Sequence, residues 1–105
     1  MTYLCKDKNG NSHIVNENGC LLASGKNALV CYDKYCKKYG KSTREKLTVA
    51  NGKLYYDSKH DKYIPQIKFE SEFETFDDDL QESYNFSFKA YIKERMRKNG
   101  LLKEV

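Results

Sequence analysis

Residues 47–56 read Leu-Thr-Val-Ala-Asn-Gly-Lys-Leu-Tyr-Tyr and contain the clearest local signal in the chain. The dipeptide Asn51-Gly52 stands between two alternating segments, which is typical of a β-hairpin with a two-residue type I′ turn. In that register the apolar residues of both strands share one face: Leu47, Val49, Leu54 and Tyr56. Turn chemistry and hydrophobic pattern therefore predict the same hairpin, with Tyr55 on its outer, polar face.

The segment after this hairpin predicts a third strand and then a long helix. Apolar and polar side chains alternate over residues 63–74, which favours a strand that extends the hairpin to a three-stranded meander. Pro65 places the start of that strand at a sheet edge. Residues 77–98 carry an amphipathic helical stripe, with Thr75 or Asp77 as its cap and Asn99-Gly100 as its end.

Upstream of residue 47, two Asn-Gly turns separate short apolar segments. Residues 3–6 and 13–15 predict a first hairpin, and residues 20–23 an optional third strand. Residues 26–39 have apolar side chains at three- and four-residue intervals, which favours a helix capped by Gly40. A second hairpin is the competing interpretation of residues 26–39, because Val and Tyr are also good strand formers.

These elements predict an α+β fold. An antiparallel sheet, made of the N-terminal hairpin and the three-stranded meander, is packed by a short middle helix and a long C-terminal helix, in the order ββ(β)αβββα. The 105 residues are expected to form one globular domain (1–105) with a loose tail at 101–105. No apolar run reaches the roughly 20 residues of a membrane span, and no signal-peptide pattern is visible. We therefore expect a cytoplasmic protein that does not enter a membrane.

The four cysteines are candidate zinc ligands or small buried hydrophobic residues: Cys5, Cys20, Cys31 and Cys36. Structural zinc sites usually contain two cysteines two to four residues apart, so that one tight turn aims both thiolates at the ion. Only the last pair approaches that spacing, and a helix would turn its two thiols roughly 140° apart. We expect no bound metal and no other cofactor, with a small zinc-stabilised protein as an alternative.

Catalytic motifs are sparse. His60 lies in a charged turn between two aspartates, and His13 lies on a predicted strand, where it would form a dyad with Cys20 only if the fold brought them together. No phosphate-binding glycine loop or nucleophile elbow occurs in the sequence. The protein is therefore not expected to be an enzyme.

Charge is segregated along the chain, although the net charge is only +4. Residues 69–84 hold seven acids and no base. We predict an acidic patch there, formed by Glu70, Glu72, Glu74, Asp77, Asp78 and Asp79. The predicted last helix carries a basic ridge of Lys89, Lys93 and Arg97 opposite its core stripe, with Phe86 beside it. Either surface could instead be a solvated face that neutralises charge elsewhere in the fold.

A second basic surface is predicted where lysine and tyrosine alternate, in residues 34–41. Its candidate binding residues are Lys34, Lys37 and Lys38, which could neutralise phosphates beside stacking tyrosines. If this segment is helical, the tyrosines face the core and only the lysines stay outside. Tyr55, on the outer face of the predicted hairpin, is the clearest exposed aromatic candidate for a protein interface.

These features favour a non-enzymatic binding protein that acts through a protein–protein interface. The abundance of residues with AT-rich codons adds a more specific expectation, a phage or mobile-element accessory protein of the anti-CRISPR kind that inhibits a host nucleic-acid-handling complex. The alternative is a DNA- or RNA-binding domain that uses the basic Lys and Arg faces. The sequence does not indicate an oligomeric state.

Overall fold

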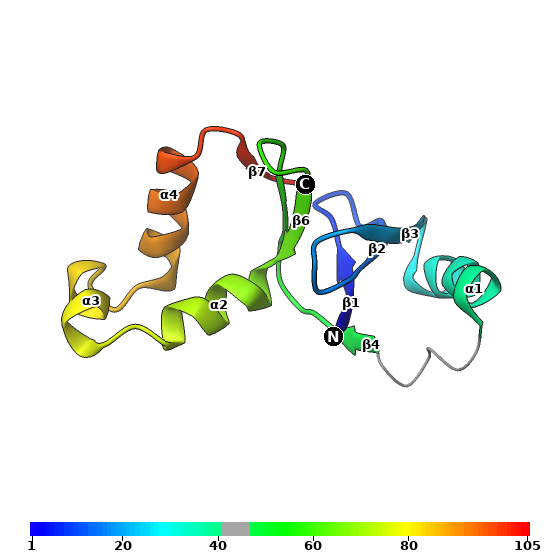
Figure 1. The fold of residues 1–105 in the computed structure, drawn as a ribbon, viewed down its shortest axis with the longest axis horizontal. Helices are drawn as coiled ribbons and strands as arrows, with labels where there is room; N and C mark the ends of the chain where they lie inside the picture. The colour runs from blue at the N-terminus through cyan, green and yellow to red at the C-terminus, as the bar shows by residue number, and fades with distance from the viewer. Residues whose placement is uncertain (41–46) are drawn as a thin grey trace.

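The computed structural model describes residues 1–40 and 47–105 (Figure 1). This part of the chain is α+β, as the sequence predicts, with two sheets and four helices. Its long axis measures 46 Å against 25 and 22 Å for the others. The radius of gyration of 14.9 Å exceeds the roughly 13 Å of a compact domain of this length, so the molecule is elongated. None of the described helices is long and apolar enough to cross a membrane.

The first sheet contains the predicted N-terminal hairpin. β1 (Thr2–Lys6) pairs antiparallel with β2 (Ser12–Val15), which pairs with β3 (Leu21–Gly25). The carboxylate of Asp7 accepts hydrogen bonds from the N–H groups of Asn9 and Asn11, and this Asx turn closes the hairpin. The hairpin and the optional third strand are therefore confirmed.

Residues 28–39 form a helix, α1 (Ala28–Tyr39), and the alternative hairpin is wrong. Asn27 caps the helix, with its side chain 3.0 Å from the N–H of Val30. Cys31 and Tyr35 are buried against the sheet, four residues apart on one helical face. The helix approaches β3 so closely that a Cβ on Gly25 would lie 2.6 Å from the nitrogen of Cys31.

The predicted hairpin at Asn51-Gly52 is wrong. β4 (Leu47–Val49) pairs in parallel with β1, whereas β5 (Leu54–Asp57) belongs to the second sheet. The N–H of Ala50 also bonds the carbonyl of Leu4, so this segment continues along β1 before it leaves the first sheet. Val49 is 65% exposed and Leu54 is fully buried, so the two do not share a face. Gly52 has the expected positive φ of 102°, but it connects two sheets and not two paired strands.

The second sheet has the order β6-β5-β7, with β6 at Lys62–Pro65 and β7 at Leu102–Glu104. The predicted loose tail is therefore wrong, because residues 102–104 form a strand antiparallel to β5. The side chain of Leu102 is only 3% exposed and belongs to the core. Burial of this apolar side chain explains why the end of the chain is ordered.

The predicted strand over residues 63–74 ends at Pro65, and α2 (Gln66–Glu74) follows. Phe69 and Phe73 are buried together. Their four-residue spacing fits both a strand and a helical face, so the alternation did not distinguish the two. Proline suits the residue that precedes the first turn, because its missing N–H is not needed there. In a helix, Glu70 and Glu74 lie on one face and Glu72 lies on another.

The predicted helix over residues 77–98 is two helices, α3 (Asp78–Ser83) and α4 (Phe88–Lys98). Asn85 and Phe86 separate them with φ angles of 56° and 55°. Ser87 then caps α4 through the N–H of Ala90. The break lets the aromatic rings of α2, α4 and the intervening segment pack on one another: Phe73, Phe76, Tyr84, Phe88 and Tyr91.

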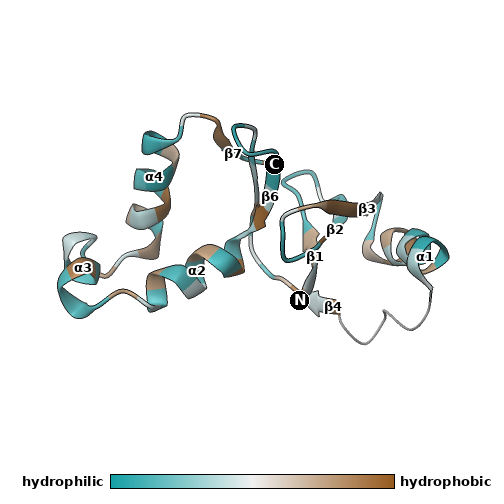
Figure 2. Cartoon of the chain, viewed as in Figure 1, coloured by the Kyte–Doolittle hydropathy of each residue, from teal (hydrophilic) through white to brown (hydrophobic). Residues whose placement is uncertain are grey.

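A shared core joins the two sheets. Tyr3, Cys5 and Val15 of the first sheet pack in one cluster with Ala50 and Leu54. The strands of both sheets carry hydrophobic stretches, and the helices alternate hydrophobic and hydrophilic residues (Figure 2). α1 lies at one end of the molecule and α3 and α4 lie at the other (Figure 1).

Candidate functional site

A groove of about 350 Å³ lies between α4 and the second sheet. Its lining comes from β5 and the residue before it, from β7, from the start of α2 and from one face of α4: Lys53, Tyr55, Gln66, Phe88, Lys89, Ile92, Lys93, Met96 and Glu104. Two residues of the predicted basic ridge and the predicted aromatic Tyr55 are therefore brought together here. The groove combines an apolar floor with a basic rim.

The floor is apolar because the core of the second sheet reaches the surface here. Tyr55 is buried, and its ring lies 5.5 Å from that of Phe69 in an edge-to-face contact. The prediction that Tyr55 is exposed is wrong, since it followed from a hairpin that does not form. Burial raises the pKa of its hydroxyl, so this side chain stays neutral. Phe88 and Met96 are partly buried beside it.

The rim carries two lysines that have no ionic partner among residues 1–40 and 47–105. Lys89 and Lys93 are exposed and lie one turn apart on α4. Neither forms an ion pair with any residue that the structure describes. Lys53, by contrast, lies 3.5 Å from the carboxylate of Glu104. The groove therefore presents uncompensated positive charge beside apolar surface, which attracts anionic groups.

Arg97 does not contribute to this groove. Its Nε and Nη2 atoms donate to the carboxylate of Glu94 at 3.2 and 2.8 Å, and Lys98 lies 3.7 Å from the same carboxylate. The bond from Arg97 holds the pKa of Glu94 below its usual range. The predicted ridge therefore ends at Lys93. Phe86 is 60% exposed, as predicted, but it lies on the α3–α4 connection and does not line the groove.

The basic face of α1 is separate from the groove, because α1 and α4 lie at opposite ends of the molecule (Figure 1). Lys34 donates to the carbonyl of Ser24, and Lys37 pairs with Asp33 at 3.3 Å. Lys38 lies over the ring of Tyr39. The predicted tract thus presents fewer available charges than its sequence suggests; its last residue, Lys41, lies outside the described residues.

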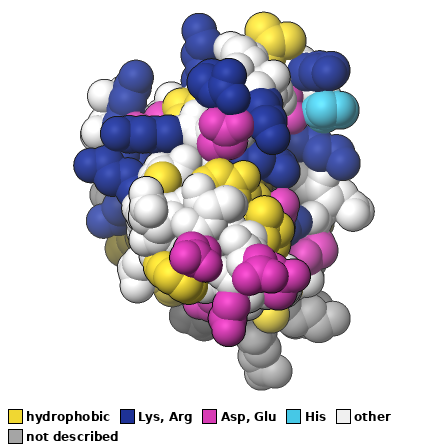
Figure 3. Space-filling model, turned by 90° about the vertical axis from the view of Figure 1, so that its left-hand side faces the viewer, with side chains coloured by type: hydrophobic (Ala, Val, Ile, Leu, Met, Phe, Trp, Pro, Cys, Tyr) yellow, Lys and Arg dark blue, Asp and Glu magenta, His cyan; other side chains and the backbone are white. Residues whose placement is uncertain are grey.

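The predicted acidic patch is divided between α2 and α3. Glu72 pairs with Arg95 at 3.3 Å, and Asp77 caps α3 by accepting from the N–H of Leu80 at 2.8 Å. Asp78 and Asp79 are exposed in the first turn of α3. Viewed onto this end of the molecule, Asp and Glu gather in the lower part and Lys and Arg in the upper part (Figure 3).

The structure distributes the four cysteines over several elements. Cys5 and Cys31 are buried, Cys20 is exposed, and all four are free thiols. No group of three metal-ligating side chains occurs in residues 1–40 and 47–105. Burial raises the pKa of Cys5 to about 12, which keeps it a neutral thiol inside the core. The described residues thus do not assemble the candidate zinc site.

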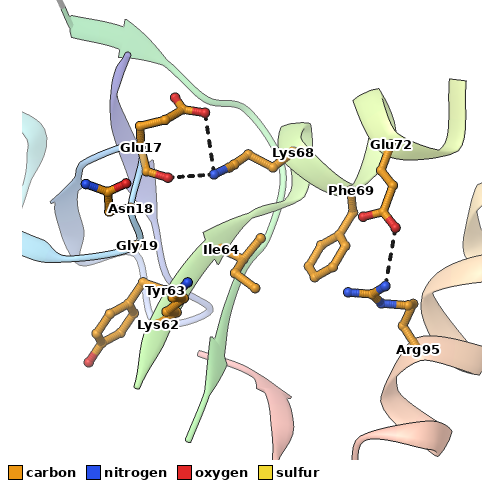
Figure 4. A pocket seen from close by; sticks show the side chains of 10 residues that line it. All are labelled: Glu17, Asn18, Gly19, Lys62, Tyr63, Ile64, Lys68, Phe69, Glu72 and Arg95. Atoms are coloured by element: carbon orange, nitrogen blue, oxygen red, sulfur yellow. Dashed lines mark hydrogen bonds and ion pairs between the residues drawn. The ribbon is translucent and has the colours of Figure 1, made fainter. Parts of the chain in front are cut away.

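A second hollow, of about 250 Å³, lies where the two sheets meet (Figure 4). Lys68 of α2 bonds the carbonyl of Glu17 at 2.8 Å, and Arg95 of α4 pairs with Glu72. The N–H of Tyr63 also donates to the carbonyl of Gly19. Because these charges are already paired with one another, we interpret this hollow as the seam between the sheets.

Each histidine contacts a carboxylate. His13 bridges Asp7 (2.9 Å) and Ser24 (2.8 Å), and His60 lies 2.7 Å from Asp57. A carboxylate, an imidazole and a hydroxyl in line are also the parts of an acyl-transfer triad. Here, however, Asp7 closes the first hairpin, and His13 and Ser24 are cross-strand partners on β2 and β3. We therefore interpret these hydrogen bonds as structural: they stabilise the turn of the first hairpin and the pairing of β2 with β3.

Sequence reasoning found the lysines of the groove but missed its floor. Phe88, Ile92 and Met96 recur every four residues, each one position before or three after a rim lysine. The opposing wall is formed by β5 together with β7; the sequence predicts β5 as a strand, but it predicts a loose tail in place of β7. A comparison with protein-family models, with curated proteins and with solved structures found no match to this chain.

Proposed function

We propose that this chain is a non-enzymatic binding protein whose groove at Lys89 and Lys93 takes a segment of a polypeptide partner. The observation that carries the proposal is one groove that combines an apolar floor with two lysines that form no ion pair with a described residue. Such a groove suits a segment that places a Leu or Phe side chain on the floor and carboxylates against the rim.

The two parts of the groove contribute differently to binding. Burial of one large apolar side chain provides about 1.5–3 kcal/mol, whereas an exposed ion pair provides about 0.2–1 kcal/mol. The floor formed by Phe88, Ile92 and Met96 therefore supplies most of the affinity. Lys89 and Lys93 steer the partner and fix its orientation.

Direct binding of DNA or RNA is the second candidate, because the same two lysines could neutralise phosphates. The apolar floor favours the protein partner, since a phosphate backbone would leave it unused. Within the protein-binding class, inhibition of a nucleic-acid-handling complex by a phage-type accessory protein is the more specific proposal; its support is the composition of the chain alone.

Selection from a displayed library of random peptides tests the proposed function. The wild-type chain is the target, and the Lys89→Glu/Lys93→Glu variant is used for counter-selection. We expect enriched peptides that combine carboxylates with a Leu or an aromatic residue. Their affinity should fall at least tenfold on the variant, about 1.4 kcal/mol.

The matched control is Lys34→Glu/Lys38→Glu, which reverses two lysines at the same spacing on α1 and should leave peptide binding unchanged. Single-stranded and duplex oligonucleotides form the other arm. Peptides that bind the groove variant as well as the wild type would contradict the proposal. Strong, salt-sensitive oligonucleotide binding that Lys89→Glu/Lys93→Glu abolishes would favour the second candidate.

A further inference from the structure

The connection around α3 carries acidic and exposed apolar side chains together. We use the name acidic knob for five residues of this connection: Asp78, Asp79, Leu80, Glu82 and Phe86. Leu80 and Phe86 are 42% and 60% exposed, and no Lys or Arg occurs between residues 69 and 88. The knob thus combines the two chemistries, carboxylate and apolar, that the groove is suited to bind.

The backbone holds Phe86 away from the core. Its φ of 55° is a conformation that bulky residues rarely adopt, and its N–H donates to the carbonyl of Gln81 at 2.8 Å. The preceding Asn85 bonds the carbonyl of Glu82 in the same way. The neighbouring rings of Tyr84 and Phe88 pack inside, whereas Phe86 stays outside.

The knob lies at the same end of the molecule as α4, which forms one wall of the groove (Figure 1). Phe86 precedes Lys89 by three residues, and α4 itself has five basic residues against one acidic residue. On this end most acidic side chains gather in the lower part of the view and most basic side chains in the upper part (Figure 3). A two-fold axis between these parts would place the acidic part of each copy on the basic part of the other.

From this charge complementarity we infer that, without another partner, the groove is occupied by the acidic knob of a second copy of this chain, in a two-fold symmetric dimer. The inference rests on the proposed function, because it names an occupant of the same groove. Leu80 or Phe86 lies on the floor of the partner's groove, and Asp78 and Asp79 face Lys89 and Lys93. Peptide binding and dimer formation then exclude each other.

The size of such an interface is compatible with the surface available. A stable interface buries about 800 Å² on each partner. The described chain exposes 6983 Å², so about a tenth of its surface is enough. Two-fold symmetry uses each knob–groove contact twice, so a modest contact is doubled.

Sedimentation velocity over a wide range of concentrations tests the dimer. We expect the wild-type chain to sediment as a dimer at high concentration. Lys89→Glu/Lys93→Glu and Asp78→Lys/Asp79→Lys should each raise the dissociation constant at least about tenfold, because each places like charges in contact. All four substitutions in one chain should restore the dimer, since both contacts are then reversed together.

Lys34→Glu/Lys38→Glu is the control and should dimerise like the wild type. A wild-type chain that stays monomeric would overturn the inference, and so would a dimer that neither charge reversal weakens or that the fourfold variant does not restore. Circular dichroism checks that each variant is folded. For a variant that is not, Leu80→Ser/Phe86→Ser replaces it, and a dimer that this double substitution leaves unchanged would also overturn the inference.

The outcomes for the dimer and for the proposed function are distinguishable. If selected peptides bind at Lys89 and Lys93 while the wild-type chain stays monomeric, the dimer is wrong and the function stands. If a dimer forms through the groove but no peptide is enriched, the groove serves self-association and the proposed function is wrong. If both hold, an added peptide should dissociate the dimer.

Discussion

The N–H of Val105 lies 2.8 Å from the carbonyl oxygen of Leu54, so the last residue of the chain extends the second sheet beyond β7. The carbonyl oxygen of Val105 in turn accepts from the N–H of Lys8, at 2.8 Å, in the turn after β1. Val105 also packs against the cluster that the two sheets share. The end of the chain therefore helps to hold the two sheets together, and it supports one wall of the groove.

This arrangement predicts that β7 contributes strongly to stability. Leu102→Ala should lower the free energy of unfolding by about 2–5 kcal/mol, because it leaves a cavity in the core beside Tyr91 and Ile92. Leu101→Ala is the control: Leu101 is 52% exposed, so its loss should cost less than about 0.5 kcal/mol. Urea unfolding measures both. If both substitutions lower the free energy of unfolding equally, the burial of Leu102 in β7 is contradicted.

Gly52 lies on the connection between the two sheets, and Gly10 and Gly100 serve as references for the effect of replacing it. Gly52 has a positive φ, and a Cβ there would lie 2.7 Å from the side chain of Gln66. That side chain accepts a hydrogen bond from the N–H of Lys53. Gly10 has a positive φ and no neighbour within 4 Å, and Gly100 has neither constraint. Gly52→Ala should therefore lower the free energy of unfolding most, by more than about 1 kcal/mol. Gly10→Ala should have a smaller effect, and Gly100→Ala the smallest.

Thermal unfolding of the three variants measures this order. If Gly52→Ala costs no more than Gly10→Ala, the packing of Gln66 on the connection is wrong.

The pairing of Asp57 with His60 predicts a loss of stability in acid. The hydrogen bond from His60 holds the pKa of Asp57 below its usual range. The carboxylate therefore contributes stability that is fully present above the unfolded pKa of about 3.9 and is lost as pH falls towards the lower folded value. The difference in unfolding free energy between the wild-type chain and Asp57→Asn should be larger at neutral pH than at low pH. Urea titrations at both pH values would show it; a difference that does not change with pH would contradict it.

Arg97 and Lys93 should differ in their effect on peptide binding, although both are basic residues of α4. Lys93→Gln removes an unpaired rim charge and should weaken binding roughly two- to fivefold, the effect of one exposed ion pair. Arg97→Gln removes a charge that Glu94 already neutralises outside the groove, so it should leave the affinity unchanged. Fluorescence anisotropy with a labelled selected peptide measures both. Equal losses would indicate a response to net charge and not to the groove.

Local signals predicted the first hairpin and α1, since their turns and caps are encoded within a few residues: Asp7, Gly10 and Asn27 act on groups nearby in sequence. The hairpin at Gly52 failed because both of its strands find distant partners. β4 pairs with β1, and β5 pairs with β7 across more than forty residues. No local pattern indicates these long-range choices.

The groove was predictable only on one side. The spacing of Lys89 and Lys93 along a helix follows from sequence, and both lie on the rim. Tyr55 is expected to be exposed, yet it contributes from a buried position. β5 pairs with β6, as in the predicted meander, but its other neighbour is β7 and not residues 47–50. The break at Phe86 is also not predicted, since Asn85 alone is a weak signal for a positive φ and a bulky residue such as Phe86 rarely adopts one.

The most direct test of the binding groove uses the two methionines of the chain, Met1 and Met96. Met96 lines the groove, whereas Met1 is 70% exposed and precedes β1. The chain is labelled with ¹³C-methyl methionine behind an N-terminal tag that retains Met1, and a selected peptide is added. We predict that the methyl resonance of Met96 shifts until the groove is saturated, while that of Met1 stays in place. Saturable peptide binding that leaves the Met96 resonance unmoved would contradict the assignment of the groove as the binding site.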